Sequence, residues 1–372
     1  MKIILSSVIN ILTIFTLHSQ ISLVTEEFAL PPNLSESSGV IYFNNKLITH
    51  NDSGKENNLY EVDTISGLVT RTITISNAVN IDWEDITHDE NSIYIADIGN
   101  NSGDRTDLKI YKISKSDYTA SNSVVADIIE ISYTNQSDFT SKTNNTEWDA
   151  EALVSFNTTH LVLFSKNWVN GNTNAYLVPK TPGNYGLSPL VTTLNSGGLI
   201  TGGTFNPLTA KLYLIGYNSI LQPFVWESEN FTNNDVFSGT NTQTFLSALG
   251  FEQVEAITYI NENKYYVTSE SFNVNGLSDY AKAVSFSTND KVLLDFNTKK
   301  KNEVVLYPNP IDNYFQINSD AVIKVEIFDT KYTRLYVGTT PKVRTSKLNS
   351  GFYFIKIYFN DNTFVIKKVV KK

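Results

Sequence analysis

The chain repeats one short pattern, in which a glutamate stands just before a β-prone run. The pattern is fullest around Glu84, where Asp82 and Trp83 come first and the run 92–97 follows. Glutamates in the same setting are Glu36, Glu84, Glu151 and Glu255, and their runs are residues 46–49, 92–97, 160–164 and 264–268. A chain that repeats in this way is expected to fold as a series of similar β modules.

The spacing of the repeat predicts the architecture. The four glutamates are separated by 48, 67 and 104 residues, and the last interval fits a further unit near position 203. That unit has no glutamate but keeps its β-prone run at 211–215, after Thr201, Gly202 and Gly203, which we expect to form a tight turn. A period of about 50 residues with short strands is typical of propeller blades.

The predicted fold class is therefore all-β, a β-propeller followed by a small β-sandwich. We expect five blades, or six if the terminal strands form a blade of their own. The run 27–30 is expected to pair with 292–296 and so close the ring. The polar insert 134–146 accounts for the long second interval.

Composition restricts the classes of function that the chain can have. The formal net charge is −9, which disfavours nonspecific binding to nucleic acid. There is no cysteine, so neither disulfides nor a thiolate metal site can form. A chain of 372 residues is long enough for two domains.

The first residues predict export. Lys2 precedes an apolar run at 3–17, which is shorter than the roughly 20 residues of a membrane-spanning helix. We interpret 1–19 as a secretory signal peptide and 20–297 as the propeller. No other segment is apolar enough to span a bilayer, so the mature chain is expected to have no transmembrane segment.

The segment 304–372 follows a charged linker at 298–303, and its sequence motifs differ from those of the repeats. It opens with Tyr307-Pro308-Asn309-Pro310, contains the run 348–353 and ends in a basic, apolar tail. These motifs resemble the type A C-terminal sorting domain of substrates of the type IX secretion system of Bacteroidetes. The family usually has a glycine soon after the aspartate that ends its central strand, whereas Thr330 follows Asp329 here, so this turn must differ.

The resemblance implies a partner and a location. It implies that residues 304–372 are recognised by the type IX secretion machinery and that the protein crosses the outer membrane. It also implies removal of the domain, with release of the protein or its attachment to the cell surface.

The repeated acids suggest a site at the axial mouth, the end of the central channel where the innermost strands would begin. If each glutamate starts such a strand, Glu36, Glu84, Glu151 and Glu255 converge there with Asp82 and Asp149. Clustered carboxylates repel one another and need a cation, protons or a cationic ligand. Oxygen ligands favour calcium or magnesium, for which we expect Glu84, Glu151 and Glu255 as ligands. The alternative is that each glutamate only holds loop amides.

Two further features have competing interpretations. The loop 97–105 contains Asp97, Asn100, Asn101 and Asp104, which could bind calcium, although such residues are also ordinary in turns. Trp83, Trp148 and Trp168 could stack on sugars or could pack between blades.

The repeats also resemble the bacterial propellers that include SdiA-regulated and phytase-like (esterase-like) proteins. The resemblance rests on residues 82–86 and 96–101, and it implies a calcium-dependent phosphoesterase. A phosphate site would need basic clusters, and only Arg105 and Lys166 lie near these motifs.

We therefore predict a secreted or surface propeller whose axial mouth binds a glycan, peptide or protein. The alternative is a divalent-metal-dependent hydrolase or lyase. The predicted ligand-binding residues are Glu36, Asp82, Trp83, Glu84, Asp97, Asn100, Asn101, Arg105, Trp148, Asp149, Glu151, Lys166 and Glu255.

Overall fold

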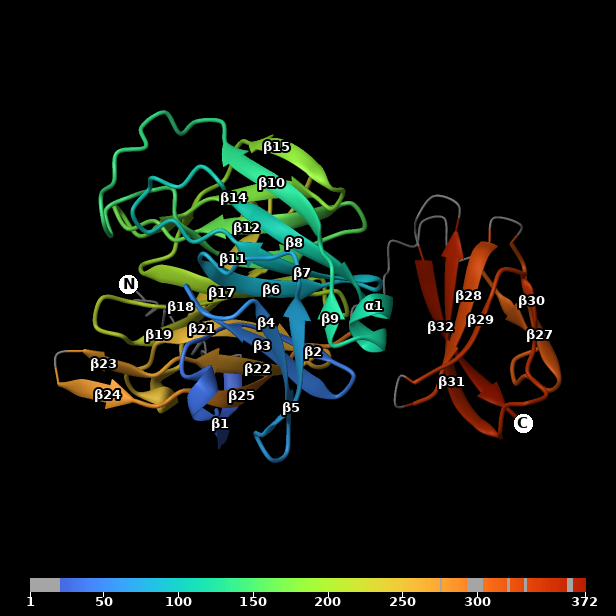
Figure 1. Cartoon of the computed structure of the whole chain (residues 1–372). Helices are drawn as coiled ribbons and strands as arrows, with labels where there is room; N and C mark the ends of the chain where they lie inside the picture. The colour runs from blue at the N-terminus through green and yellow to red at the C-terminus, as the bar shows by residue number, and fades with distance from the viewer. Residues whose placement is uncertain (1–20, 275, 293–303, 320–321, 331–332, 360–363) are drawn as a thin grey trace, which may run out of the picture. The chain divides into compact units, whose positions relative to one another are not determined.

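The computed structural model describes residues 21–274, 276–292, 304–319, 322–330, 333–359 and 364–372 (Figure 1). The chain divides into two compact units, with the boundary between Lys291 and Val292. The predicted signal peptide at 1–19 and linker at 298–303 lie outside the described residues.

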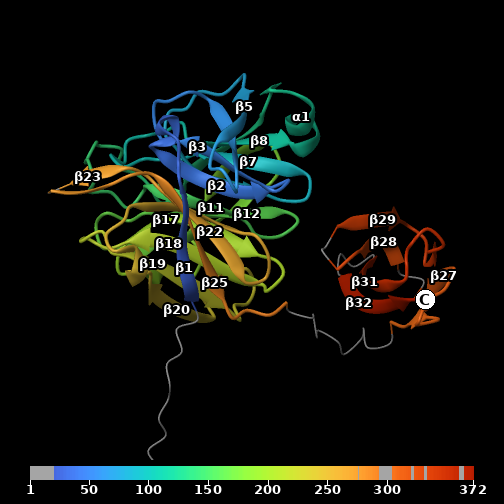
Figure 2. The same cartoon turned by 90° about the horizontal axis from the view of Figure 1, so that it is seen from below.

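The first unit is a β-propeller, as predicted. In its described residues five mainly antiparallel sheets follow one another in a closed ring, because each innermost strand contacts the next and the last contacts the first (Figures 1 and 2). The innermost strands are β2 (Ser37–Phe43), β6 (Trp83–His88), β11 (Ala150–Ser155), β17 (Leu199–Asn206) and β21 (Val254–Tyr259).

The first two blades continue outward from β2 and from β6. Blade 1 adds β3 (Lys46–Asn51), β4 (Asn58–Asp63), β5 (Val69–Ile75) and β9 (Ser123–Val124). Blade 2 adds β7 (Ser92–Asp97), β8 (Lys109–Ser114), β10 (Asp127–Tyr133) and β15 (Gly183–Leu187). A short helix, α1 (Lys115–Ala120), follows β8 and begins at Ser114, whose hydroxyl accepts a hydrogen bond from the Asp117 amide.

The remaining three blades are built in the same way. Blade 3 adds β12 (His160–Ser165) and β14 (Ala175–Pro179) to β11, and β13 (Asn172–Thr173) pairs with β16 (Leu194–Asn195) nearby. Blade 4 adds β18 (Lys211–Tyr217), β19 (Pro223–Glu229) and β20 (Thr240–Phe245). Blade 5 adds β22 (Lys264–Ser269), β25 (Lys282–Thr288) and β1 (Ile21–Ala29). Short elements between them are η1 (Pro32–Leu34), η2 (Ser247–Leu249), β23 (Phe272–Val274) and β24 (Leu277–Asp279).

The N-terminal strand closes the ring, but with a partner other than the predicted one. β1 pairs antiparallel with β25, so that Phe28 lies opposite Ala283. The strand expected at 292–296 lies outside the described residues except for Val292, which is not in a strand. β1 occupies the outer edge of blade 5 and leaves the strand beside it with both edges paired.

Two strands join neighbouring blades at their outer edges. β9 runs parallel to β5 of blade 1, although it comes from the chain of blade 2. β15, which follows blade 3 in sequence, runs parallel to β10 of blade 2. The chain therefore breaks between β9 and β10, and the break is held by Asn77, whose side-chain amide exchanges two hydrogen bonds with the Ala126 backbone.

The blades pack on one another through both faces of their middle strands. In β7, Ile93 and Ile95 belong to the core between blades 1 and 2, whereas Tyr94 and Ala96 belong to the core on the blade 3 side. Successive side chains of a strand point to opposite faces, so an uninterrupted apolar run suits this position.

The second unit is the expected small β-sandwich. Its two antiparallel sheets share one core, in which Phe315 and Ile355 are fully buried. The turn expected to differ after Asp329 includes residues 331–332, which lie outside the described residues. The smaller sheet contains β26 (Leu306–Tyr307), β27 (Tyr314–Ile317) and β30 (Lys342–Arg344). The larger sheet contains β29 (Arg334–Gly338), β28 (Val322–Phe328), β31 (Gly351–Phe359) and β32 (Phe364–Lys371).

Candidate functional site

Each innermost strand has a register irregularity near its start. In β6, β11 and β21 the residues skipped by the pairing are Glu84, Glu151 and Glu255, and in β17 the skipped residue is Thr201. A bulge re-aims a side chain that would otherwise follow the pleat, and bulges are common beside functional sites. The repeated glutamates therefore occupy the bulges of three innermost strands. The repeat in the sequence predicts these glutamates at the strand starts.

Glu36 does not belong to this set. Ser37 pairs with Asn51 as Trp83 pairs with Asp97, so Glu36 corresponds to Asp82 and not to Glu84. Its side chain is 39% exposed and forms an ion pair with Lys55 at 3.1 Å. The 48-residue interval was thus two residues out of register with the structural repeat.

A second ring of positions lies where the second strands of blades 1, 3, 4 and 5 end. Asp52, Lys166 and Glu270 directly follow β3, β12 and β22, and Tyr217 is the last residue of β18. Asp52, Tyr217 and Glu270 were not predicted. The charges of Asp52 and Glu270 act on Glu84 and Glu255, respectively, and the bulge carboxylates in turn act on Tyr217, so the two rings face each other. The axial mouth, as the structure has it, consists of Asp52, Asp82, Glu84, Asp149, Glu151, Lys166, Tyr217, Glu255 and Glu270.

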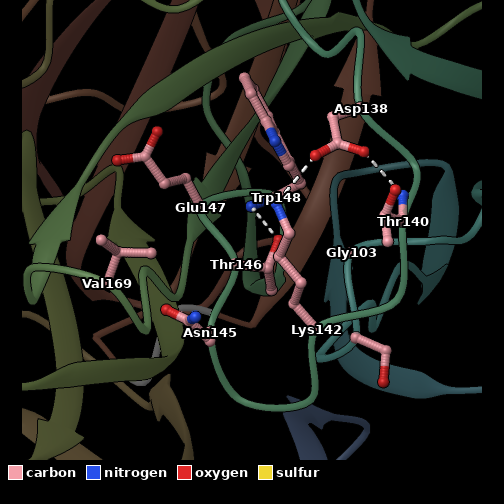
Figure 3. Close-up of a pocket in the computed structure, with 10 residues that line it drawn as sticks. Gly103, Asp138, Thr140, Lys142, Asn145, Thr146, Glu147, Trp148 and Val169 are labelled. Atoms are coloured by element: carbon pink, nitrogen blue, oxygen red, sulfur yellow. Dashed lines mark hydrogen bonds and ion pairs between the residues drawn. The ribbon is translucent and has the colours of Figure 1, made fainter.

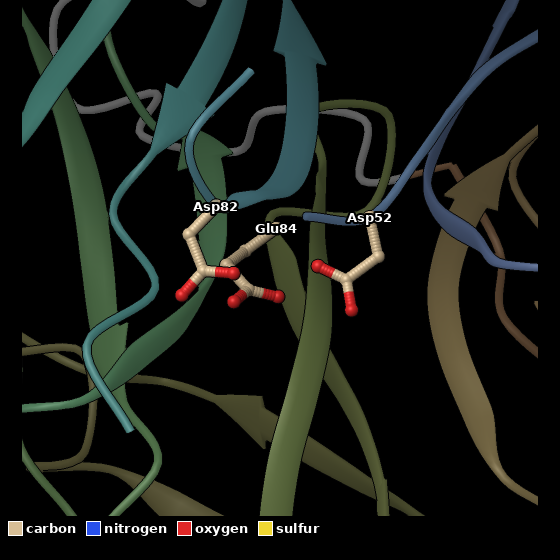
Figure 4. A group of neighbouring side chains, drawn as sticks. All are labelled: Asp52, Asp82 and Glu84. Atoms are coloured by element: carbon tan, nitrogen blue, oxygen red, sulfur yellow. The ribbon is translucent and has the colours of Figure 1, made fainter. Parts of the chain in front are cut away.

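Glu84 lies at the centre of the carboxylates. Its oxygens complete two groups whose ligand atoms all lie within 4.8 Å of one another, one with Asp52 and Asp82 (Figure 4) and one with Asp149 and Glu151. Glu255 belongs to neither group, so the predicted ligand set of Glu84, Glu151 and Glu255 coincides with neither of them.

The charges around Glu84 are unbalanced. The side chain is buried, and after burial the influences that raise its pKa well above the usual range are the carboxylates of Glu151, Asp52, Asp82 and Asp149. Burial, together with Asp52 and Asp149, also raises the pKa of Asp82 to about 7. A carboxylate loses its charge when neither water nor a cation compensates for it.

Lys166 provides positive charge on one side of the mouth. Its ammonium contacts the Glu151 carboxylate and lies 5.1 Å from the centre of the Trp168 ring. It also acts to lower the pKa of Glu255, but burial and the nearby Glu270 outweigh it, and the pKa of Glu255 is raised. One ammonium does not neutralise this many acids.

The blade 5 side of the mouth offers hydrogen-bonding groups. The Gln253 amide donates to the Glu270 carboxylate at 2.9 Å. Burial, with Asp52 as the next cause, raises the pKa of Glu270 to about 7. Tyr217 is nearly buried beside Lys166, Glu255 and Glu151, and its pKa is raised mainly by that burial.

Asp149 is held firmly by two donors. Its Oδ1 accepts the Asn100 amide at 2.7 Å, and its Oδ2 accepts Trp168 Nε1 at 2.7 Å. The Asn100 side chain in turn donates to the Trp148 carbonyl at 3.1 Å. Asn100 therefore positions Asp149 from the neighbouring blade.

The rest of the loop 97–105 is stabilised internally. Arg105 donates to Asp97 at 2.9 Å and to the Gly99 carbonyl at 2.7 Å. The Asn101 carbonyl accepts the Asn144 amide at 2.8 Å, and Asn101 is exposed. Asp97 also accepts a hydrogen bond from the Asp82 amide at 3.1 Å, and Arg105 acts to lower the pKa of Asp82, so both residues support the loop beside the cluster.

Gly99 brings this loop directly against the acids. A Cβ at this position would lie 2.0 Å from Glu84 Oε1 and 2.3 Å from Asp82 Oδ2. Only glycine allows such a close approach of backbone to the two carboxylates.

The tryptophans have different roles. Trp83 is fully buried and its ring packs edge-on against His50 at 5.6 Å, so it is a core residue and not a sugar platform. Trp148 is half-buried against Tyr133, with ring centres 5.7 Å apart. Thr201, Gly202 and Gly203 lie inside β17 and do not form the expected turn; a Cβ on Gly202 would lie 2.3 Å from the Glu255 carbonyl oxygen.

Comparison with known proteins identifies the second unit. Residues 305–372 match the secretion system C-terminal sorting domain. This confirms the type IX sorting domain predicted from the sequence, and with it an interaction with the type IX secretion machinery. The protein is therefore exported, to the cell surface or the medium. No helix in the described part of the chain has the length and apolar character needed to cross a bilayer.

Solved structures with distant similarity cover much of the chain. An exo-β-1,3-galactanase from Phanerochaete chrysosporium is 8% identical, with 93% of this chain and 99% of that chain covered and a TM-score of 0.45. An aldose sugar dehydrogenase from Streptomyces coelicolor is 9% identical, with coverages of 71% and 98% and a TM-score of 0.42. No curated protein matches the chain.

Proposed function

We propose that this exported propeller is a binding protein whose axial mouth holds a divalent cation. The ligands are Asp52, Asp82 and Glu84, with Asp149 and Glu151 completing the site. The observation that carries the proposal is Glu84, a buried carboxylate shared by two groups of closely spaced oxygens, whose pKa is raised first by burial and then by other carboxylates. The cation in turn recruits an oxygen-rich ligand, such as a glycan or the carboxylate of a peptide or protein.

The chemistry of the cluster favours a hard cation. Within each group of three carboxylates the oxygens are close enough to share one ion, because calcium binds oxygen at about 2.3–2.6 Å. Calcium also tolerates irregular geometry, whereas magnesium demands a near-ideal octahedron and retains water. Carboxylates from three blades suit calcium, and ligand positions not filled by protein remain for water or the recruited molecule.

The test is calorimetric titration of the chelator-treated protein with CaCl₂ and, separately, MgCl₂. We expect saturable calcium binding and at least tenfold weaker binding in Glu84→Gln, which keeps the size of the side chain but removes its charge. The matched control is Glu130→Gln, on the outer strand β10, which should bind as the wild type does. The absence of calcium binding in a folded wild-type protein would refute the proposal.

A second candidate function is hydrolysis in the same mouth. Asp82 and Glu270 have pKa values of about 7, which suits general acid and base catalysis near neutral pH. If the mouth is catalytic, p-nitrophenyl phosphate or a p-nitrophenyl glycoside should be turned over with calcium present, and Asp82→Asn should remove that turnover. Calcium binding without turnover of either substrate class would favour the binding protein.

A further inference from the structure

A second concave site lies beside the axial mouth. It is a cavity of about 290 Å³ formed by the loop 97–105 and by the insert that follows β10. Figure 3 shows the side chains that surround it. Those used below are Asp138, Thr140, Lys142, Asn145, Glu147 and Trp148.

The insert is fixed on the loop by many hydrogen bonds. The amides of Lys142 and Asn144 donate to the carbonyls of Ser102 and Asn101, both at 2.8 Å. Gln136 donates from its side chain to the Gly103 carbonyl at 2.8 Å. Long irregular loops in compact domains are usually functional or disordered, and this one is held in a defined shape. The insert thereby forms a wall of the cavity.

The lining combines one aromatic side chain with uncharged polar residues and with the charged residues Asp138, Lys142 and Glu147. Trp148 is half-buried against Tyr133 and contributes its remaining surface to the cavity. Asn145 and Thr140 add groups that can donate and accept hydrogen bonds. Lys142 is neutralised by Asp138 at 2.8 Å, and Figure 3 shows this pair at the cavity wall.

We propose that this cavity binds one sugar residue of a neutral glycan. A pyranose presents an apolar face that packs on an indole ring and hydroxyls that need both donors and acceptors. The pairing of Lys142 with Asp138 and the exposed Glu147 disfavour phosphate and other anions. The cavity volume is too small for a folded partner but large enough for a monosaccharide unit.

The cavity and the axial mouth are adjacent but chemically separate. Trp148 lines the cavity, while the next residue, Asp149, belongs to the carboxylate groups. No carboxylate of the two groups around Glu84 lines the cavity. Sugar binding here therefore does not require a cation, so this proposal can fail or succeed independently of the proposed function.

The test is titration of the full chain with D-glucose, D-galactose and D-mannose. Binding is measured by tryptophan fluorescence and by calorimetry. We expect at least one sugar to bind saturably in the millimolar range with a change in fluorescence. Trp148→Ala should weaken that binding at least tenfold, and Trp148→Phe, which keeps an aromatic face, should weaken it less. Asp104→Asn, in the same loop but not at the cavity, is the matched control.

The outcomes separate the two sites. Binding that persists in EDTA and in Glu84→Gln, but is lost in Trp148→Ala, supports the cavity. Because Trp148→Ala could loosen the insert, Asn145→Ala provides a milder second variant that should also weaken binding. No saturable signal with any of the three sugars, or equal binding by wild type and both variants, would overturn the proposal.

Discussion

Gly99 shows how much of the mouth depends on a missing side chain. Adding a methyl group would place Cβ 2.0 Å from Glu84 Oε1, so the carboxylate would have to move. We predict that Gly99→Ala lowers calcium affinity at least tenfold while the protein remains folded, as measured by calorimetry and circular dichroism. Asn101→Ala, an exposed position of the same loop, should leave the affinity unchanged. Equal affinities in the two variants would contradict this role of Gly99.

We predict that His88 makes the stability of the propeller sensitive to acid. Burial, and then the charge of Lys115, lower the pKa of His88 to about 3, and Lys115 Nζ lies 2.6 Å from its Nδ1. A group with a lowered folded-state pKa takes up a proton on unfolding, so stability is lost as pH falls below 6.5. If the whole pKa shift applied, the free energy of unfolding would fall by about 2 kcal/mol between pH 7 and pH 5. Because the ring is partly exposed, we expect a fall of about 1 kcal/mol.

The measurement is urea unfolding of wild type and His88→Gln at pH 7 and pH 5. Glutamine keeps an oxygen that can accept from Lys115 but does not titrate in this range. Between pH 7 and pH 5, we expect the free energy of unfolding to fall by about 1 kcal/mol less in the variant than in the wild type. Identical losses would exclude His88 as the source of the acid sensitivity.

At the scale of the elements, Asp85 joins three of the innermost strands, β6, β11 and β17. This fully buried carboxylate accepts the Leu153 amide of β11 at 2.8 Å and the Gly203 amide of β17 at 3.4 Å. It therefore connects β6 to two other blades. Asp85→Ala would leave those amides without this acceptor in the interior, where an unsatisfied group costs roughly 1–3 kcal/mol.

We predict that Asp85→Ala lowers the free energy of unfolding by about 3 kcal/mol, measured by urea denaturation. The control is Asp127→Ala, an exposed aspartate at the start of β10, which should change stability by no more than about 0.5 kcal/mol. A similar small change in both variants would show that Asp85 does not bridge the blades.

The elements could be predicted from the sequence more completely than the site. Glu84, Glu151 and Glu255 follow the repeat, and their positions at the strand starts follow from it. Asp52 and Glu270 follow the second strands of their blades, at positions where the sequence repeats no common residue. Their convergence depends on strand register across blades, which side-chain periodicity within one blade does not define. The bulges that re-aim the glutamates also leave no signal in the hydrophobic pattern.

At the scale of the whole molecule, each unit has its own core. The propeller ends at Lys291, and the sandwich is built around Phe315 and Ile355. We predict that a protein comprising 21–291 unfolds at the same temperature as the propeller in the full chain and binds calcium equally well. Calorimetric scanning and titration of the two proteins test this. A lower unfolding temperature for the shorter protein would mean that the sorting domain stabilises the propeller.

The parallel pairings of β9 with β5 and of β15 with β10 have a consequence for a protein that works outside the cell. Without cysteines, no covalent cross-link protects it from digestive enzymes. A protease must first draw an extended segment out of the fold, and here the edge of one blade is covered by chain from the next. Peeling one module away thus disturbs its neighbour, and resistance to cleavage should follow the cooperative opening of several modules.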